Sequence, residues 1–283
     1  MKKLFHDYPC LQRQIPSSLN KLRKRALILV PGFMGKDEME AEKVRRVRAL
    51  AEKMTPIHTC IYYILASRLL SCSNYQPCYL AICPICGGVA QLNDMRKYMG
   101  LFERDKDYIA ISIDMNKNIS KITKGIDSFP DIINNIQNRI DPLFKSMDFD
   151  GVIAGRIVME HHSFEMASEE DYCVPQIRLL IKDNDSVMKR MENYLMRSGN
   201  MYVRDSILNT PLRKYSFENP EEILAYVFDR SWYERPCTVT SEKILMKGEA
   251  RQLSGGDFAD YLVRQRNYIS NYVRLHYYKG NTK

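Results

Sequence analysis

The sequence predicts an α+β fold in which helices flank a central antiparallel sheet. Three observations lead to this prediction. Apolar residues recur at helical spacing in the first third of the chain, strand-like runs occupy the middle third, and cysteines cluster between these regions. We expect a helical and cysteine-rich region at residues 1–106, an α+β core at 107–238, and a loop with a C-terminal helix at 239–283.

Composition and charge are those of a globular protein with a polyanionic partner. Of its 283 residues, 45% are hydrophobic and 27% are charged, as in ordinary globular domains. The 42 basic residues exceed the 34 acidic residues and give a net charge of +8. This balance favours nucleic acid as the partner, although a role in solubility alone would also account for it.

The chain contains no apolar run of roughly 18 residues, so we expect no membrane-spanning helix. Its apolar run at residues 26–33 is short and is interrupted by Pro31 and Gly32. Residues 1–7 lack the continuous apolar segment of a signal peptide. We therefore expect a cytoplasmic protein with reduced thiols and no membrane partner.

Helical patterns dominate the first third of the chain. In residues 36–53, Val44, Val47 and Leu50 recur at helical spacing among dense charges, which predicts an amphipathic helix. Its basic face could lie on phosphates or could simply be solvated. Residues 59–70 read as a second helical or buried segment, and residues 89–99 as a further helix.

A cysteine cluster interrupts these helices. Cys83 and Cys86 are separated by Pro84 and Ile85, which is the spacing of a zinc knuckle. Two cysteines at this spacing supply half of a tetrahedral site. Cys78 and Cys72 could complete the ligand set. We expect a closed structural Zn²⁺ site; the alternative is a loop of buried thiols without metal.

Strand signals begin at residue 108. Residues 108–114 alternate apolar and polar side chains, and helical periodicity returns at residues 129–147. Residues 151–159 and 175–181 are two more β-type runs separated by an acidic, polar stretch. This order predicts an antiparallel pair of strands joined by a loop.

Two helices follow the strands, at residues 186–196 and 220–228. The second has the signals of a helix start, because Asn219 can cap it, Pro220 suits the first helical position, and acidic residues fill the first turn.

The C-terminal part is polar at residues 239–256, which indicates a loop, and then becomes rich in tyrosine and arginine. Here Arg264, Arg266 and Tyr268 could pair with phosphates and stack on bases of single-stranded nucleic acid. The same residues would also be ordinary in a packed terminal helix.

The order of these segments resembles that of plasmid rolling-circle replication initiators of the HUH endonuclease superfamily, over roughly residues 78–235. That family has a cysteine element, three strands, and a helix bearing a nucleophilic tyrosine. The resemblance implies an HUH-like core that binds single-stranded or hairpin DNA and nicks and joins it. The matching segments are Cys78-x-x-x-x-Cys83-Pro-x-Cys86, Ile109–Asp114, Gly155–Glu160, Val174–Ile181 and Ile223–Arg230.

By this resemblance, Tyr226 matches the nucleophile, which forms a 5′-phosphotyrosine and frees a 3′-hydroxyl. Three positions depart from the family pattern. Gln176 and Arg178 stand where the family has its metal-binding histidines. Asp229 stands at its lysine position, with Arg230 beside it as a candidate DNA contact.

The departures leave alternatives for the catalytic cation. Glu160, His162 and Gln176 could hold Mg²⁺ or Mn²⁺, but Arg178 has no acceptor atom and would repel the cation. Arg178 could instead form a cross-strand salt bridge with Glu160 or bind a DNA phosphate bidentately. Without the metal, nicking would be slow or absent while DNA binding survived.

We therefore expect a DNA-binding protein that resembles a rolling-circle initiator, with Tyr226 and Arg178 as catalytic residues if endonuclease and strand-transfer activity persists. One alternative is an inactive HUH-like regulator or accessory factor. The other is a zinc-stabilised interaction protein with no role in DNA.

Overall fold

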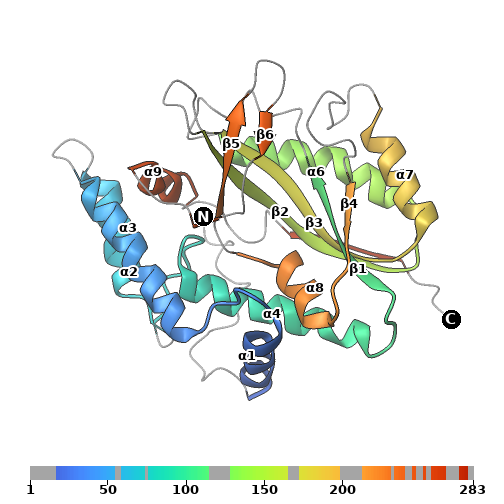
Figure 1. Cartoon of the computed structure of the whole chain (residues 1–283), viewed down its shortest axis with the longest axis horizontal. Coiled ribbons are helices and arrows are strands. Elements are labelled where there is room, and N and C mark those ends of the chain that lie inside the picture. The colour runs from blue at the N-terminus through green and yellow to red at the C-terminus, as the bar shows by residue number, and fades with distance from the viewer. Residues whose placement is uncertain are drawn as a thin grey trace, which may run out of the picture. The chain divides into compact units, whose positions relative to one another are not determined.

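The computed structural model describes residues 17–54, 59–73, 76–114, 128–164, 172–197, 212–230, 233–239, 244–246, 251–252, 256–265 and 274–279. The chain forms two compact units (Figure 1). One combines residues 1–99 with 255–267, and the other combines 100–254 with 268–283. The sequence predicts three consecutive parts (1–106, 107–238 and 239–283), and that division stays a prediction.

The first unit is helical in its described residues. Helices α2 (Lys36–Glu52) and α3 (Thr59–Leu70) confirm the two helices predicted there. Helix α1 (Ser17–Leu29), which the sequence reading missed, buries Leu19, Leu22 and Ala26 at helical spacing. Helix α4 (Pro84–Phe102) begins inside the cysteine segment, and α9 (Gly256–Gln265) packs against α2 and α3.

The second unit begins with an alternation of strands and helices that defines its fold. In chain order these are β1 (Tyr108–Asp114), α6 (Ser128–Ser146), β2 (Gly151–Phe164), β3 (Tyr172–Lys182), α7 (Asp185–Leu195) and β4 (Leu212–Tyr215). The four strands pair in the order β4-β1-β3-β2, and every pair is antiparallel. This βαββαβ arrangement is ferredoxin-like, so the predicted α+β class with a central antiparallel sheet is confirmed.

Further elements extend the sheet and cover it. Strand β8 (Arg274–Lys279) pairs antiparallel with the first half of β2 and makes a fifth antiparallel strand. Strand β5 (Tyr233–Val239) pairs parallel with the last part of β2 and carries β6 (Ile244–Met246) and β7 (Arg251–Gln252). Helix α8 (Pro220–Val227) packs on β1 and β3.

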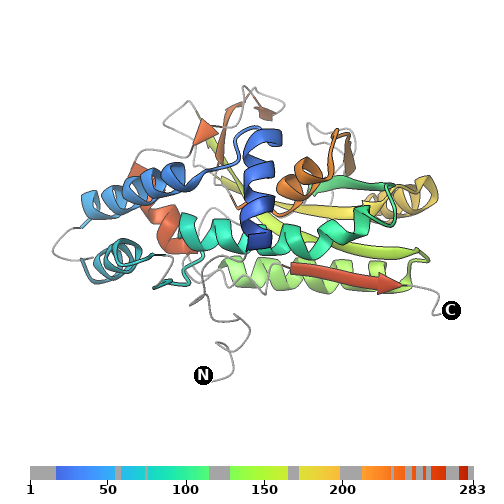
Figure 2. The ribbon, with the colours of Figure 1, turned by 90° about the horizontal axis from the view of Figure 1, so that it is seen from below.

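Strand alternation gives the sheet two different faces. One face carries a continuous apolar core under α6 and α7, which includes Ile111, Ile113, Ile153, Ile157, Ile177, Leu179, Ile181 and Leu275 from the strands. The opposite face carries Ser112, Gln176 and Arg178 and is covered in part by α8. In Figure 2, α8 (orange) and α6 (light green) lie on opposite sides of the sheet.

Two expectations for the C-terminal part need correction. The predicted loop at residues 239–256 contains the short strands β6 and β7, and residues 274–279 form strand β8 instead of continuing a terminal helix. Alternation explains β8, since Leu275 and Tyr277 pack into the apolar core from one face of the strand. Among the described residues, no helix is long and apolar enough to cross a membrane.

Candidate metal centre and tyrosine site

Four cysteines of the first unit converge. Cys72 follows α3, Cys78 lies in the next loop, Cys83 directly precedes α4, and Cys86 lies in the first turn of α4. All four Sγ atoms lie within 4.8 Å of one another. The cysteine pairs 72–83, 72–86 and 78–86 have Sγ–Sγ distances of 3.4, 3.5 and 3.9 Å.

These distances fit a single tetrahedral cation. Four thiolates bound at about 2.3 Å would place their sulfur atoms about 3.8 Å apart, whereas a disulfide needs about 2.05 Å. The cysteines are free, and Cys72, Cys78 and Cys83 are buried. The cluster therefore suits a closed metal site without an open coordination position.

The local sequence explains why the thiols face one another. Cys83 N–H donates to the Leu80 carbonyl at 3.1 Å, which closes a tight turn directly before the helix. Pro84 then starts α4 with a backbone angle already suited to a helix. Tyr79, next to Cys78, has a φ of +56°, a left-handed conformation that reverses the chain.

The four thiols are close enough to shift one another's pKa. Contact with the Cys72 thiol, the other two thiols and burial raise the pKa of Cys83. Contact with Cys72 and Cys78, together with burial, raises that of Cys86. Hydrogen bonds from Cys78, Cys83 and Cys86 lower the pKa of Cys72. A divalent ion at this site would have to displace thiol protons, because only thiolates act as ligands.

In the second unit, Tyr226 of α8 lies against Arg178 of β3. The Arg178 guanidinium carbon lies 4.7 Å from the centre of the Tyr226 ring, in cation–π contact. Its Nη1 lies 3.3 Å from Asp229 Oδ2 and 3.4 Å from the Tyr226 carbonyl. Arg178 thus lies between Tyr226 and Gln176. The sequence predicts that the Glu160 side chain joins this group, and that part lies outside the described residues.

The Tyr226 phenol lies in an aromatic and hydroxyl environment. Its ring centre lies 4.5 Å from that of Tyr215 and 5.5 Å from that of Phe217. Burial raises the pKa of Tyr226, the Arg178 charge opposes that rise, and interaction with Tyr215 adds to it, while a hydrogen bond with Ser112 lowers it. Burial therefore favours the protonated form of the phenol.

Gln176 does not offer a free ligand for a divalent metal. Its side chain is buried, with 3% exposed, and its Oε1 accepts a hydrogen bond from Arg178 Nε at 2.8 Å. The guanidinium thus holds the oxygen that a cation would need. Glu160 and His162 belong to β2, but their side chains are outside the described part of the structure, so their role as ligands stays a prediction.

The expected Glu160–Arg178 salt bridge is contradicted by the strand register. Glu160 pairs with Val174, whereas Arg178 pairs with Arg156. The partner of Arg178 is Asp229, which occupies the position where the family has a lysine. The sequence alone does not indicate that Asp229 pairs with Arg178, because the two residues are 51 positions apart.

A row of arginines crosses the same sheet face, and the sequence reading missed it. Pairing places Arg213 opposite Ser112, Ser112 opposite Arg178, Arg178 opposite Arg156, and Arg156 opposite Arg274. We call Arg213, Arg178, Arg156 and Arg274 the arginine row. Arg156 is buried, Arg213 and Arg178 are half-buried, and Arg274 is exposed. Their positions within the strands alternate with apolar residues, but only the register aligns them.

The predicted nucleic-acid residues are only partly within the described structure. Arg230 is half-buried just after α8. Arg264 lies in α9, in the other unit, and its side chain is outside the described part, as are Arg266 and Tyr268. Their contact with DNA stays a prediction.

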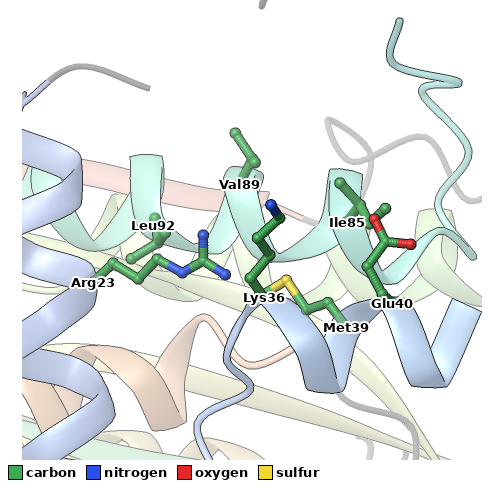
Figure 3. A pocket seen from close by; sticks show the side chains of 8 residues that line it. Arg23, Lys36, Met39, Glu40, Ile85, Val89 and Leu92 are labelled. Atoms are coloured by element: carbon green, nitrogen blue, oxygen red, sulfur yellow. The ribbon is translucent and has the colours of Figure 1, made fainter. Parts of the chain in front are cut away.

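A small pocket lies in the first unit (Figure 3). Its apolar wall comes from α4, where a side chain at Gly88 would collide with Met39 of α2. Glu40 at the pocket is already paired with Lys43 at 2.6 Å. The pocket thus combines the basic side chains of Arg23 and Lys36 with an apolar wall. Its lining consists of Arg23, Lys36, Met39, Glu40, Ile85, Gly88, Val89 and Leu92.

Comparison with protein-family models, curated proteins and solved structures finds no match to this chain.

Proposed function

We propose that this chain is a DNA-binding protein resembling a rolling-circle replication initiator, and that its sheet face holds DNA phosphates without cleaving them. The arginine row is the observation that carries this proposal. At the two ends of this row Arg274 is exposed and Arg213 is half-buried, in a chain of net charge +8, and arginine pairs with phosphate bidentately. Between them, Arg156 and Arg178 contact α8 and the residues that follow it.

The tyrosine site supports binding more than cleavage. The guanidinium of Arg178 engages Gln176 Oε1 and Asp229 Oδ2, where the family would hold a divalent metal. A metal polarises the scissile phosphate and contributes several kcal/mol in the transition state. The half-buried Tyr226 would then be a structural tyrosine, and the chain would correspond to the inactive regulator or accessory factor.

The four-cysteine cluster supports a structural role for a metal, which we propose to be Zn²⁺. Tetrahedral, all-sulfur coordination is typical of closed zinc sites. A second candidate function, a zinc-stabilised interaction protein, is favoured by large apolar side chains exposed in the same unit: Ile28, Leu70 and Tyr63 have 82%, 60% and 59% of their surface exposed.

Binding to a fluorescent single-stranded hairpin, measured by anisotropy over a range of salt concentrations, tests the main proposal. Arg274→Gln and Arg213→Gln should each weaken binding, and each should reduce the slope of log affinity against log salt by about 0.7. Lys189→Gln is the matched control, because Lys189 is exposed on α7, which covers the opposite face. Unchanged binding in both arginine variants would refute the sheet-face assignment, and no binding at low salt would favour the interaction protein.

Incubation of the same hairpin with protein and Mn²⁺ separates binding from cleavage. We expect no covalent adduct on a denaturing gel. A covalent adduct with the wild type that is absent with Tyr226→Phe would show instead that the nicking activity implied by the resemblance persists.

A further inference from the structure

Three basic side chains hold the main chain of the cysteine segment. Lys43 Nζ donates to the Cys72 carbonyl at 3.2 Å, and Arg68 Nη2 donates to the Cys78 carbonyl at 2.7 Å. Arg46 Nη1 donates to the carbonyl of Ile82, the residue before Cys83, at 2.7 Å. The three donors belong to α2 and α3, and each acceptor belongs to a cysteine of the cluster or its direct neighbour.

Arg46 is the most deeply placed of the three. Only 2% of its surface is exposed, and burying a charge is costly unless it is paired and hydrogen-bonded. Its Nε forms an ion pair with Glu42 Oε1 at 2.7 Å. A buried, ion-paired arginine therefore lies directly beside the main chain that leads into Cys83.

These cations lie where metal binding would create negative charge; Lys43 and Arg46 are also ion-paired with Glu40 and Glu42, whereas the structure shows no carboxylate paired with Arg68 among the described residues. A divalent ion bound by four thiolates carries two net negative charges, and this dianion would lie among buried cysteines. Nearby positive charges stabilise it, and their hydrogen bonds to the carbonyls hold the ligand segment in the shape that brings the thiols together. Groups that support metal ligands in this way typically change metal affinity by about 10- to 100-fold.

We propose that Lys43, Arg46 and Arg68 form a cationic clamp that sets the metal affinity of the four-cysteine centre. The clamp rests on the proposal that this centre binds Zn²⁺. It acts on the thiolates by charge and on the ligand segment by hydrogen bonds, and none of its members is itself a metal ligand.

Competition between the full-length protein and a chromophoric chelator for Zn²⁺ measures the clamp. Arg68→Gln and Lys43→Gln should each weaken Zn²⁺ binding by about 10-fold or more. They should also shift the pH at which half the protein is metal-bound upward, because protons compete better with the metal once a stabilising charge is lost. Arg68→Lys, which keeps the charge, should recover part of both effects. Arg48→Gln, an exposed position on the same α2 helix, should change neither quantity.

The controls separate the clamp from folding and from the metal site itself. Arg46→Gln removes a buried partner of Glu42 and can unfold the protein, so the exposed Arg68 provides the decisive variant. Far-ultraviolet circular dichroism of the metal-loaded variants should match that of the wild type. Wild-type affinity and an unshifted pH midpoint in both Arg68→Gln and Lys43→Gln would overturn the clamp alone. Failure of the wild type to bind Zn²⁺ or Co²⁺ would overturn the metal centre with it.

Discussion

Gly155 in β2 lies directly beside the backbone that carries Arg178. A β-carbon at this position would collide with the Arg178 carbonyl oxygen and would lie 2.9 Å from the Leu179 α-carbon. Both obstacles are backbone atoms, which cannot rotate away. The absence of a side chain at Gly155 therefore allows β2 and β3 to pair closely at the arginine row.

Gly155→Ala should lower the free energy of unfolding by about 3 kcal/mol, in the upper range for overpacking in a rigid site. Urea unfolding followed by circular dichroism measures this change. Gly100→Ala is the control, because no atom lies within 4 Å of the added carbon. It should stabilise α4 by up to about 1 kcal/mol, since alanine has the higher helix propensity. Equal effects of the two substitutions would contradict the close contact at Gly155.

At this scale, alternation along a strand predicts that Gln176 and Arg178 share one face of β3, but it does not predict the chemistry around them. The role of Asp229 depends on how the chain turns after α8, and the alignment of Arg156 with Arg178 depends on strand register. Neither follows from local spacing.

At the scale of elements, helix α8 is fixed at both ends by polar groups. Asn219 Oδ1 accepts a hydrogen bond from Glu222 N–H at 3.0 Å, which confirms the predicted N-cap. At the other end, Arg156 Nη1 lies 3.5 Å from the carbonyls of Phe228 and Asp229. Cations near a helix C-terminus are favourable, so this arginine helps to place the helix that carries Tyr226.

Asn219→Ala should destabilise the protein by about 1 kcal/mol, because an amide donor of the first turn would lose its acceptor. Thermal or chemical unfolding is a sufficient measurement. Asn135→Ala, at an exposed position within α6, should change stability by no more than about 0.5 kcal/mol. A loss as large at Asn135 would argue against a specific capping effect.

Strands can be predicted from the sequence where their apolar pattern extends over many consecutive residues. Strands β1, β2 and β3 have clear apolar alternation or apolar runs, and the sequence predicts the antiparallel pairing of β2 with β3. Strand β4 has only four residues, and β5 contains Pro236, which is a signal against an interior strand. Strand β8 was read as helix because its tyrosines and arginines suit either structure, and only packing against the core decides between them.

At the scale of the whole molecule, the two units differ in what holds them together. The second unit has a continuous apolar core between its sheet and the helices α6 and α7. The first unit buries apolar side chains such as Leu50, Leu69 and Met95 and also has the four-cysteine cluster. The Zn²⁺ proposed there would contribute directly to folding. The units should therefore respond differently to metal removal.

Addition of a strong zinc chelator should lower the melting temperature of the first unit and leave that of the second nearly unchanged. In differential scanning calorimetry, the unfolding transitions of the two units should lie close together without chelator and should separate when chelator is added. Cys83→Ser should reproduce the effect without chelator. Cys60→Ser, a change at an exposed cysteine outside the cluster, should not. A uniform shift of both transitions would contradict separate stabilisation.

The first unit is discontinuous in the chain, and this limits how the protein can be dissected. Helix α9 returns from near the C-terminus, where Asp260 accepts a hydrogen bond from Tyr62 at 2.6 Å and Phe258 lies 4.2 Å from the guanidinium of Arg45. A fragment truncated after the cysteine segment would lack these partners and would expose the apolar surfaces of α2 and α3. A faithful isolated version of this unit would need α9 supplied in trans or joined through a new linker.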